Sequence, residues 1–131
     1  MERTGRFLLD TNIVIALFAG EAAVQQRLTE SGEVFVPSIV LGELYYGARK
    51  STRVTENLAR IDEFATRSTV LSCDTAIAQQ YGEIKSQLRA KGRPIPENDI
   101  WIAAIAMQYQ LTLVARDGHF HEVDGSRVEA W

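Results

Sequence analysis

Four acidic residues stand at positions where a folded chain would more readily carry an apolar or neutral side chain. Asp10 ends the first apolar run, and Glu43 interrupts a helical apolar pattern. Asp99 precedes the apolar run 100–106, and Asp117 follows the run 113–115. If these carboxylates converge, their repulsion raises their pKa values or destabilises the fold unless a divalent cation offsets the charge. The pattern therefore indicates a metal site, and cations held by carboxylates can activate water for phosphodiester hydrolysis.

Each acid also has an ordinary explanation when it is taken alone. Asp99 can cap a helix, and Asp117 with Gly118 can form a turn. Glu43 is harder to explain in this way, because its neighbours in the helical pattern are apolar and a glutamate there needs a cation or a basic partner. The four acids taken together favour a shared site.

Asp10 gives the strongest single signal. Thr11 and Asn12 follow it, and both can cap a helix and hydrogen-bond to a metal-bound water. Cys73 is the only cysteine, which excludes an internal disulfide and a cysteine-based zinc site, and two histidines offer little for zinc. Any metal must therefore be held mainly by oxygen, which favours Mg²⁺ or Mn²⁺.

The elements that would position these acids alternate along the chain. Short segments rich in Val, Leu or Phe predict five strands: Arg6 to Leu9, Glu33 to Val36, Thr69 to Leu71, Thr112 to Ala115 and Arg127 to Glu129. Apolar residues spaced three and four apart predict six helices: Asn12 to Ala19, Glu21 to Ser31, Ser38 to Lys50, Thr52 to Thr66, Thr75 to Lys91 and Ile100 to Tyr109. This alternation predicts a three-layer α/β/α domain with a parallel sheet of about five strands.

Local signals support several of these boundaries. Pro37-Ser38 precedes one helix, Asp74-Thr75 caps another, and Gly92 with Pro94 ends it. Asn98 or Asp99 can cap the last helix, and 118–126 is expected to be a longer loop.

The predicted topology brings the four acids to one place. Ligands of an open parallel sheet bind outside the carboxyl ends of its strands. Asp10 and Asp117 directly follow the first and fourth predicted strands. Glu43 lies in the first turns of the helix after the second strand, and Asp99 begins the helix that leads into the fourth. All four can therefore reach the same edge of the sheet.

Composition sets the limits of this interpretation. A chain of 131 residues that is 46% hydrophobic and 24% charged fits one globular domain, 1–131. The short apolar run at the start is too brief for a signal peptide, and no run approaches the roughly 20 apolar residues of a membrane span, so we expect a cytoplasmic protein. A net charge of −3 argues against nucleic-acid binding through bulk positive charge.

Local basic clusters remain possible nucleic-acid contacts. One contains Lys85, Arg89, Lys91 and Arg93, and the other contains Arg49, Lys50 and Arg53. Taken alone, each cluster is better explained as a solvated helix face, and only a position beside the acids would change that. Arg116 can either contact an RNA phosphate or pair with a neighbouring acid.

The acids lie in motifs with a family resemblance. These are Leu9-Asp10-Thr11-Asn12, Gly42-Glu43-Leu44, Asn98-Asp99-Ile100-Trp101-Ile102-Ala103-Ala104 and Arg116-Asp117-Gly118-His119-Phe120. In this order they resemble the successive motifs of PIN-domain ribonucleases, and the VapC toxins most closely. The resemblance runs from about Phe7 to the C-terminus, and the combination is specific where a single motif would be weak.

The resemblance implies an endoribonuclease that depends on Mg²⁺ or Mn²⁺ and is inhibited by a cognate VapB-like antitoxin. It assigns metal binding to Asp10, Glu43 and Asp99, with Asp117 as a further ligand. Hydrolysis by metal-activated water would leave a 5′-phosphate and a 3′-hydroxyl. The family often has a hydroxyl residue where this chain has Ala115, so Thr11 and Asn12 are the candidate supporting residues.

The resemblance also implies partners. VapC-like toxins commonly form homodimers and grip an antitoxin segment with the helices that correspond to 21–66. This part of the chain carries many apolar residues for so small a domain: Tyr45, Tyr46, Leu58, Ile61 and Phe64. Ordinary core packing must account for most of them, and the remainder are expected to form the partner surface.

Two other functions remain open. A PIN-like domain can serve as a catalytically weak RNA- or protein-binding module, although retention of four acids argues against this. A phosphohydrolase with Asp10 as covalent nucleophile would usually need a second acid where this chain has Asn12. We further expect His119 and His121 to be exposed loop residues, with Phe120 packed beneath the site, and Cys73 to be a small core residue.

Overall fold

A parallel sheet forms the centre of the molecule. The structure, a computed structural model, describes residues 2–131. Five strands are present: β1 (Thr4–Leu9), β2 (Ser31–Pro37), β3 (Thr69–Leu71), β4 (Thr112–Val114) and β5 (Val128–Glu129). Their order is β3-β2-β1-β4-β5, and all neighbouring pairs are parallel. The first strand therefore lies in the middle, which places the residue after it at the centre of the carboxyl edge.

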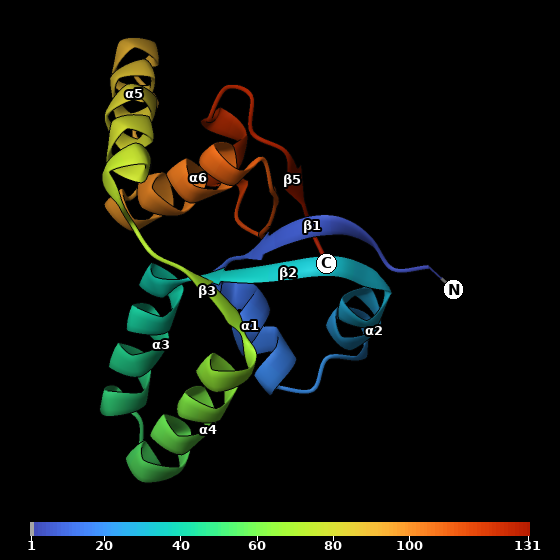
Figure 1. Cartoon of the computed structure of the whole chain (residues 1–131). Helices are drawn as coiled ribbons and strands as arrows, with labels where there is room; N and C mark the ends of the chain where they lie inside the picture. The colour runs from blue at the N-terminus through green and yellow to red at the C-terminus, as the bar shows by residue number, and fades with distance from the viewer. Residues whose placement is uncertain (1) are drawn as a thin grey trace.

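Helices cover both faces of the sheet. They are α1 (Thr11–Phe18), α2 (Ala22–Glu30), α3 (Ser38–Lys50), α4 (Val54–Arg67), α5 (Thr75–Lys91) and α6 (Glu97–Tyr109), with a short 3₁₀ helix, η1 (Gly118–Glu122), after β4. Figure 1 shows α1 to α4 on one side of the sheet and α5 with α6 on the other. The predicted three-layer α/β/α architecture is confirmed. Among residues 2–131, none of the helices is both long and apolar enough to cross a membrane.

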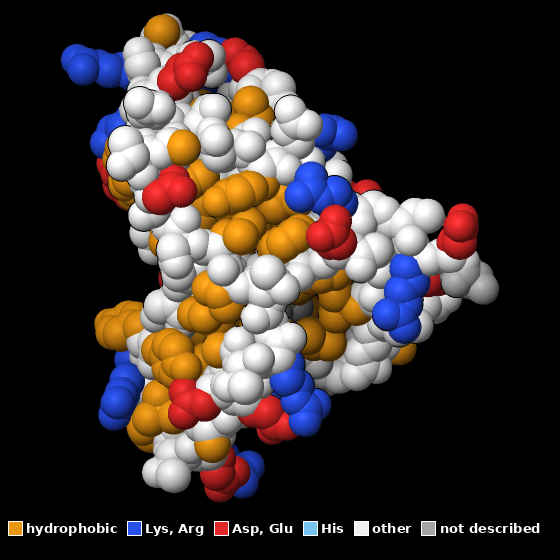
Figure 2. Space-filling model, in the orientation of Figure 1, with side chains coloured by type: hydrophobic (Ala, Val, Ile, Leu, Met, Phe, Trp, Pro, Cys, Tyr) orange, Lys and Arg blue, Asp and Glu red, His pale blue; other side chains and the backbone are white. Residues whose placement is uncertain are grey.

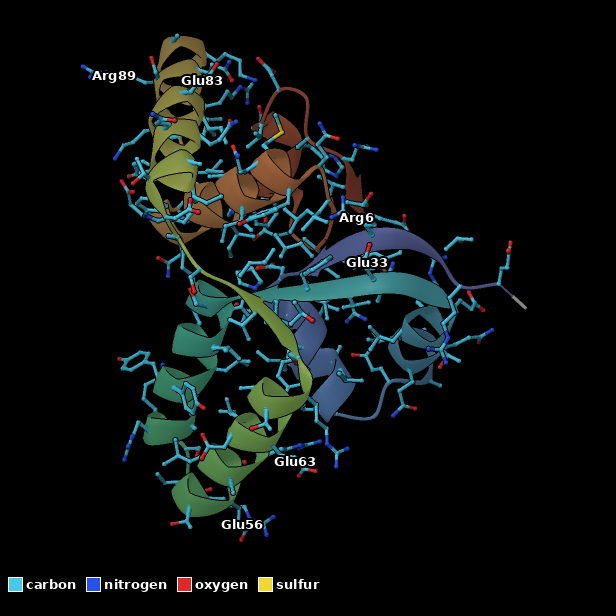
Figure 3. The ribbon with its side chains drawn as sticks, viewed as in Figure 1. Arg6, Glu33, Glu56, Glu63, Glu83 and Arg89 are labelled. Atoms are coloured by element: carbon cyan, nitrogen blue, oxygen red, sulfur yellow. The ribbon has the colours of Figure 1, made fainter. Side chains whose placement is uncertain are left out.

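The strand register is supported from both sides of the backbone. Leu8 and Leu9 are almost fully buried in the core, as expected for the end of a central parallel strand. On the exposed part of the same strand pair, Arg6 of β1 lies opposite Glu33 of β2, with Nε 3.1 Å from Oε1. Figure 3 shows these two side chains together on neighbouring strands. A slip of one residue would move Arg6 away from Glu33 and break this pair.

Predicted start and stop signals are found at the ends of α3 and α5. Pro37 directly precedes α3, where its missing N–H costs no helical hydrogen bond. Asp74 caps α5, because its Oδ1 accepts a hydrogen bond of 3.0 Å from the backbone N–H of Ile77. Gly92 ends α5 with φ +65°, a left-handed conformation that glycine adopts without strain.

The start of α6 differs from the prediction in a way that matters for function. This helix begins at Glu97 after Pro96, so it starts one turn before the predicted Ile100. The prediction that Asn98 or Asp99 caps the helix is therefore wrong. Asp99 lies in the first turn instead, on a helix in which Ile100 and residues 102–106 are buried. A rigid, buried helix thus holds this carboxylate.

Smaller boundary differences follow from sheet pairing. Ser31 belongs to β2 rather than to the preceding helix, because Thr4 pairs with it across the sheet. The helix predicted from Asn12 begins at Thr11. The expected loop 118–126 contains η1, since the Asp117 side chain accepts the backbone N–H of His119 and starts a 3₁₀ turn.

Of two expectations about apolar side chains, one is wrong and the other is confirmed. Cys73 is exposed rather than a core residue, because it follows the edge strand β3, which has one neighbour only. Of the five apolar residues named within 21–66, Ile61 is 3% exposed, and Tyr45, Leu58 and Phe64 pack partly buried against the core. Core packing therefore accounts for most of them, as expected. Tyr46, at 65% exposed, is the one that lies open to solvent.

Candidate metal centre

Strands β1 and β4 end side by side at the carboxyl edge of the sheet, and Asp10 directly follows β1. Leu9 is paired with Val114, and the backbone N–H of Asp10 donates to the Val114 carbonyl at 3.0 Å. The Asp10 carbonyl in turn accepts the backbone N–H groups of Ile13 and Val14, which starts α1. Asp10 is therefore fixed on both sides by backbone hydrogen bonds, so its side chain has a defined position at the centre of the edge.

The Asp10 carboxylate is buried and surrounded by negative charge. Only 6% of the residue is exposed. Burial raises its pKa to about 6, a backbone hydrogen bond from Thr11 acts in the opposite direction, and Asp99, Glu43 and Asp117 each raise the pKa further. The three other acids predicted from sequence therefore lie close enough to act on the Asp10 carboxylate.

Glu43 is held by two polar neighbours from different elements. Its Oε2 accepts a hydrogen bond from the Thr11 hydroxyl at 3.1 Å, and its Oε1 lies 3.4 Å from the Asn98 amide nitrogen. Thr11 begins α1 and Asn98 lies in the first turn of α6. The second turn of α3 is therefore tied to both neighbouring helices through this carboxylate, which explains a glutamate in an apolar pattern.

Asp99 and Asp117 meet at a histidine. The Nδ1 atom of His119 lies 3.2 Å from Asp99 Oδ2 and 3.1 Å from Asp117 Oδ1. Burial raises the pKa of Asp99, the hydrogen bond with His119 lowers it, and the charge of Asp117 raises it again. These three side chains each offer one ligand atom, and the atoms lie within 4.8 Å of one another. This group can hold a metal ion.

The residues present fit a divalent cation. Within residues 2–131, no lysine or arginine forms an ion pair with any of the four acids, and the one basic side chain in contact with them is the imidazole of His119. Carboxylate oxygens are the ligands that Mg²⁺ and Mn²⁺ prefer. A buried acid whose neighbours are also acids is stable at neutral pH only if a cation offsets their charge or a proton neutralises one of them.

The remaining predicted site residues have different surroundings. Asn12 is exposed on α1. Of the two roles left open for Arg116, the structure shows the ion pair, because its guanidinium binds both carboxylate oxygens of Glu21, at 2.8 and 3.2 Å. Arg89 and Arg93 are exposed at the C-terminal end of α5 and just beyond it. Figure 3 shows Arg89 extending outward from that end.

Two residues of the site were not recognised from sequence. His119 is exposed, as predicted for a loop residue, yet its ring contacts two of the acids. The spacing Asp117-x-His119 at the start of a turn was the available signal. Asn98 was interpreted as a cap, whereas its amide contacts Glu43. Phe120 is fully buried in the core, as predicted.

Comparison with known proteins gives a consistent result. A family model described as "PIN domain" matches residues 7–126. The chain is 39% identical to "Ribonuclease VapC2" of Haemophilus influenzae, covering 96% of this chain and 98% of that protein. It is 38% identical to the "tRNA(fMet)-specific endonuclease VapC" of Shigella flexneri, with the same coverage.

Solved structures agree with the sequence relatives. The DNA-bound VapBC of Salmonella typhimurium matches with a TM-score of 0.89 and 33% identity, covering 100% of this chain and 99% of that one. VapBC2 from Rickettsia felis, bound to a DNA fragment from its promoter, matches with a TM-score of 0.88 and 29% identity, covering 95% and 98%. A central parallel sheet between two layers of helices, with four acids at its carboxyl edge, defines the class of protein as an α/β/α domain of the PIN type. The chain belongs to the PIN-domain family, among the relatives of VapC ribonucleases.

Proposed function

We propose that the chain is a metal-dependent endoribonuclease toxin that acts in the cytoplasm and is inhibited by a VapB-like antitoxin. The observation that carries this proposal is the buried carboxylate of Asp10. Three further acids repel its negative charge, and within residues 2–131 no lysine or arginine forms an ion pair with it. The names of the ribonuclease and tRNA endonuclease relatives support the type of reaction. We treat residues 1–131 as one PIN unit.

The chemistry follows from the side chains. Four acids would hold Mg²⁺ or Mn²⁺: Asp10, Glu43, Asp99 and Asp117. The bound cation would supply an activated water and a Lewis acid for the scissile phosphate. Thr11 and Asn98 orient Glu43, which keeps its oxygens available at a fixed place. Arg89 and Arg93, exposed near the end of α5, are proposed contacts for RNA phosphates. Cleavage should leave a 5′-phosphate and a 3′-hydroxyl.

Cleavage of total cellular RNA tests this proposal. We expect discrete fragments with Mg²⁺ or Mn²⁺, none with EDTA, and at least a roughly 100-fold loss of rate for Asp99→Asn, because a metal ligand is removed. Asp124→Asn is the matched control, since Asp124 is exposed and pairs with Lys91 instead of the site acids. Gel analysis and end-labelling of the fragments measure both rate and end chemistry.

Either of two results would contradict the proposal. A 2′,3′-cyclic phosphate on the fragments would exclude attack by water. If the folded, antitoxin-free chain cleaves no RNA under any of these conditions, the catalytically weak binding module becomes the better description.

A groove beside the site suits the antitoxin. It has a volume of about 280 Å³ and lies between α1, α3 and α4. Apolar side chains including Ile15, Phe18 and Leu44 line it, and Thr11 and Glu43 form part of its wall. Figure 2 shows hydrophobic side chains gathered over α3 and α4 on the face in view. The VapBC structures among the relatives support a protein partner at this family's surface.

Ile15 gives the sharpest test of the groove, because it is 50% exposed and lines the groove, so a charge there should not unfold the chain. We expect Ile15→Glu to weaken binding of the co-expressed antitoxin at least about tenfold, since an apolar contact becomes a buried charge. Tyr109→Ser is the control, because Tyr109 is an exposed apolar residue on α6, outside the groove. Titration calorimetry measures the affinities, and equal affinities for the two variants would rule the groove out as the antitoxin site.

Size measurement of the chain alone should show a homodimer.

A further inference from the structure

The ring of His119 occupies an unusual position between two carboxylates. Its Nδ1 lies 3.2 Å from Asp99 Oδ2 and 3.1 Å from Asp117 Oδ1, while the backbone N–H of His119 donates to the same Asp117 oxygen at 2.9 Å. One ring nitrogen therefore faces two acceptors that come from different elements, the first turn of α6 and the residue before η1.

As a donor, Nδ1 of His119 can serve both carboxylates only through one shared hydrogen, and only its contact with Asp99 has hydrogen-bond geometry. It carries at most one hydrogen, and a neutral ring that points its lone pair at two negative oxygens is repelled by them. A cation between the three atoms would bind the ring lone pair and both carboxylates at once, and the three ligand atoms lie within 4.8 Å of one another. Neighbouring ligands of an octahedral ion at about 2.1 Å are about 3 Å apart, which is close to the two separations observed.

The fold holds this ring in place without involving it in the core. Asp117 starts η1 by accepting the His119 N–H, and Phe120, the next residue, is fully buried. The His119 side chain is 47% exposed, so a cation can reach it from solvent. His121 lies in the same 3₁₀ helix and is also exposed, but it has no hydrogen bond or ion pair with an acid within residues 2–131.

We propose that Nδ1 of His119 is a ligand of the same cation as Asp99 and Asp117. The inference rests on the metal dependence proposed above and adds a nitrogen donor to an oxygen site. Imidazole suits first-row transition ions, whereas Mg²⁺ prefers oxygen and water. His119 therefore biases this site toward Mn²⁺ over Mg²⁺, and a site expected to bind mainly through oxygen becomes a mixed one.

Electron paramagnetic resonance of bound Mn²⁺ tests this assignment directly, since it detects nitrogen in the coordination sphere. The protein is loaded with Mn²⁺ and compared with protein that carries ¹⁵N-labelled histidine. We expect a histidine nitrogen coupling that changes with the label, disappears in His119→Ala and persists in His121→Ala. Competition titrations should show at least about a tenfold loss of Mn²⁺ affinity in His119→Ala, with a smaller loss for Mg²⁺.

The result separates this inference from the nuclease proposal. If wild-type protein binds Mn²⁺ and cleaves RNA but shows no histidine coupling, the ligand role of His119 is wrong and the nuclease stands. A coupling retained in His119→Ala also overturns it. If wild-type protein binds no Mn²⁺ and cleaves RNA in EDTA, both the inference and the metal dependence fail. If His119→Ala fails to fold, His121→Ala decides the matter, because that variant leaves His119 as its only histidine and must keep the coupling.

Discussion

Asp10→Asn is expected to abolish RNA cleavage and at the same time to stabilise the metal-free protein. The carboxylate is 6% exposed, and its pKa is raised from 3.8 to about 6. A difference of about two pH units corresponds to about 3 kcal/mol, at about 1.4 kcal/mol per unit. Asparagine has almost the same shape but no charge, so it removes this cost together with the ligand.

The sign of the pH dependence follows from the raised pKa. Between pH 3.8 and about 6 the folded chain binds a proton at Asp10 that the unfolded chain has released. Stability of the wild-type chain in EDTA should therefore fall as the pH rises through this range, and the full cost remains above it. The two unfolding free energies should be similar near pH 4 and differ by up to about 3 kcal/mol near pH 7.

Urea denaturation in EDTA across this pH range measures the effect. Adding Mn²⁺ should stabilise the wild-type chain by mass action and the variant much less. Asp124→Asn serves again as the control, because this exposed acid is paired with Lys91 and should leave the pH profile unchanged in shape. If the unfolding free energies of wild type and Asp10→Asn changed with pH in parallel, Asp10 would not be the acid whose pKa is raised in the folded chain.

Phe120→Ala is expected to cause the largest loss of stability, about 3–5 kcal/mol, because it removes a fully buried aromatic ring and leaves a cavity. The ring anchors η1, and the Phe120 carbonyl accepts the hydroxyl of Ser126 at 3.0 Å. Loss of this anchor should also loosen His119 and Asp117, so cation affinity should fall with stability. Thermal and urea unfolding measure the first effect, and calorimetric Mn²⁺ titration measures the second.

Phe120→Leu provides the comparison, since it keeps much of the apolar volume. Its loss of unfolding free energy should be clearly smaller, and its cation affinity should stay close to that of the wild-type chain. If the alanine variant lost less than about 1 kcal/mol of unfolding free energy, packing of Phe120 in the core would not be what holds η1, Asp117 and His119 in place.

Sequence reasoning was most successful where the signal is local. The Asp74 cap and the Gly92 stop depend on residues within one turn of the helix end, and both are present. Strand alternation sufficed to bring four acids to one edge, because parallel topology leaves few alternatives. The register of Ser31 with Thr4 is a contact between distant segments and could not be derived from local pattern.

The errors arose where distant contacts decide the outcome. His119 meets Asp99 across 20 residues of sequence, so its spacing to Asp117 alone did not reveal its role. Cys73 follows a strand whose edge position depends on the order of the whole sheet. The start of α6 was predicted one turn too late, because Pro96 rather than an acidic residue precedes its first residue, Glu97.

The shared wall of the groove and the acidic site has a thermodynamic consequence. Thr11 and Glu43 line the groove, and Glu43 is also one of the four acids. Any groove ligand that changes the position of Glu43 changes the affinity of the site for a cation by some factor. By linkage, the cation then changes the affinity of that groove ligand by the same factor. Antitoxin and metal are therefore each expected to change the affinity of the chain for the other. The fraction of the chain bound to either one would then depend on the concentrations of both.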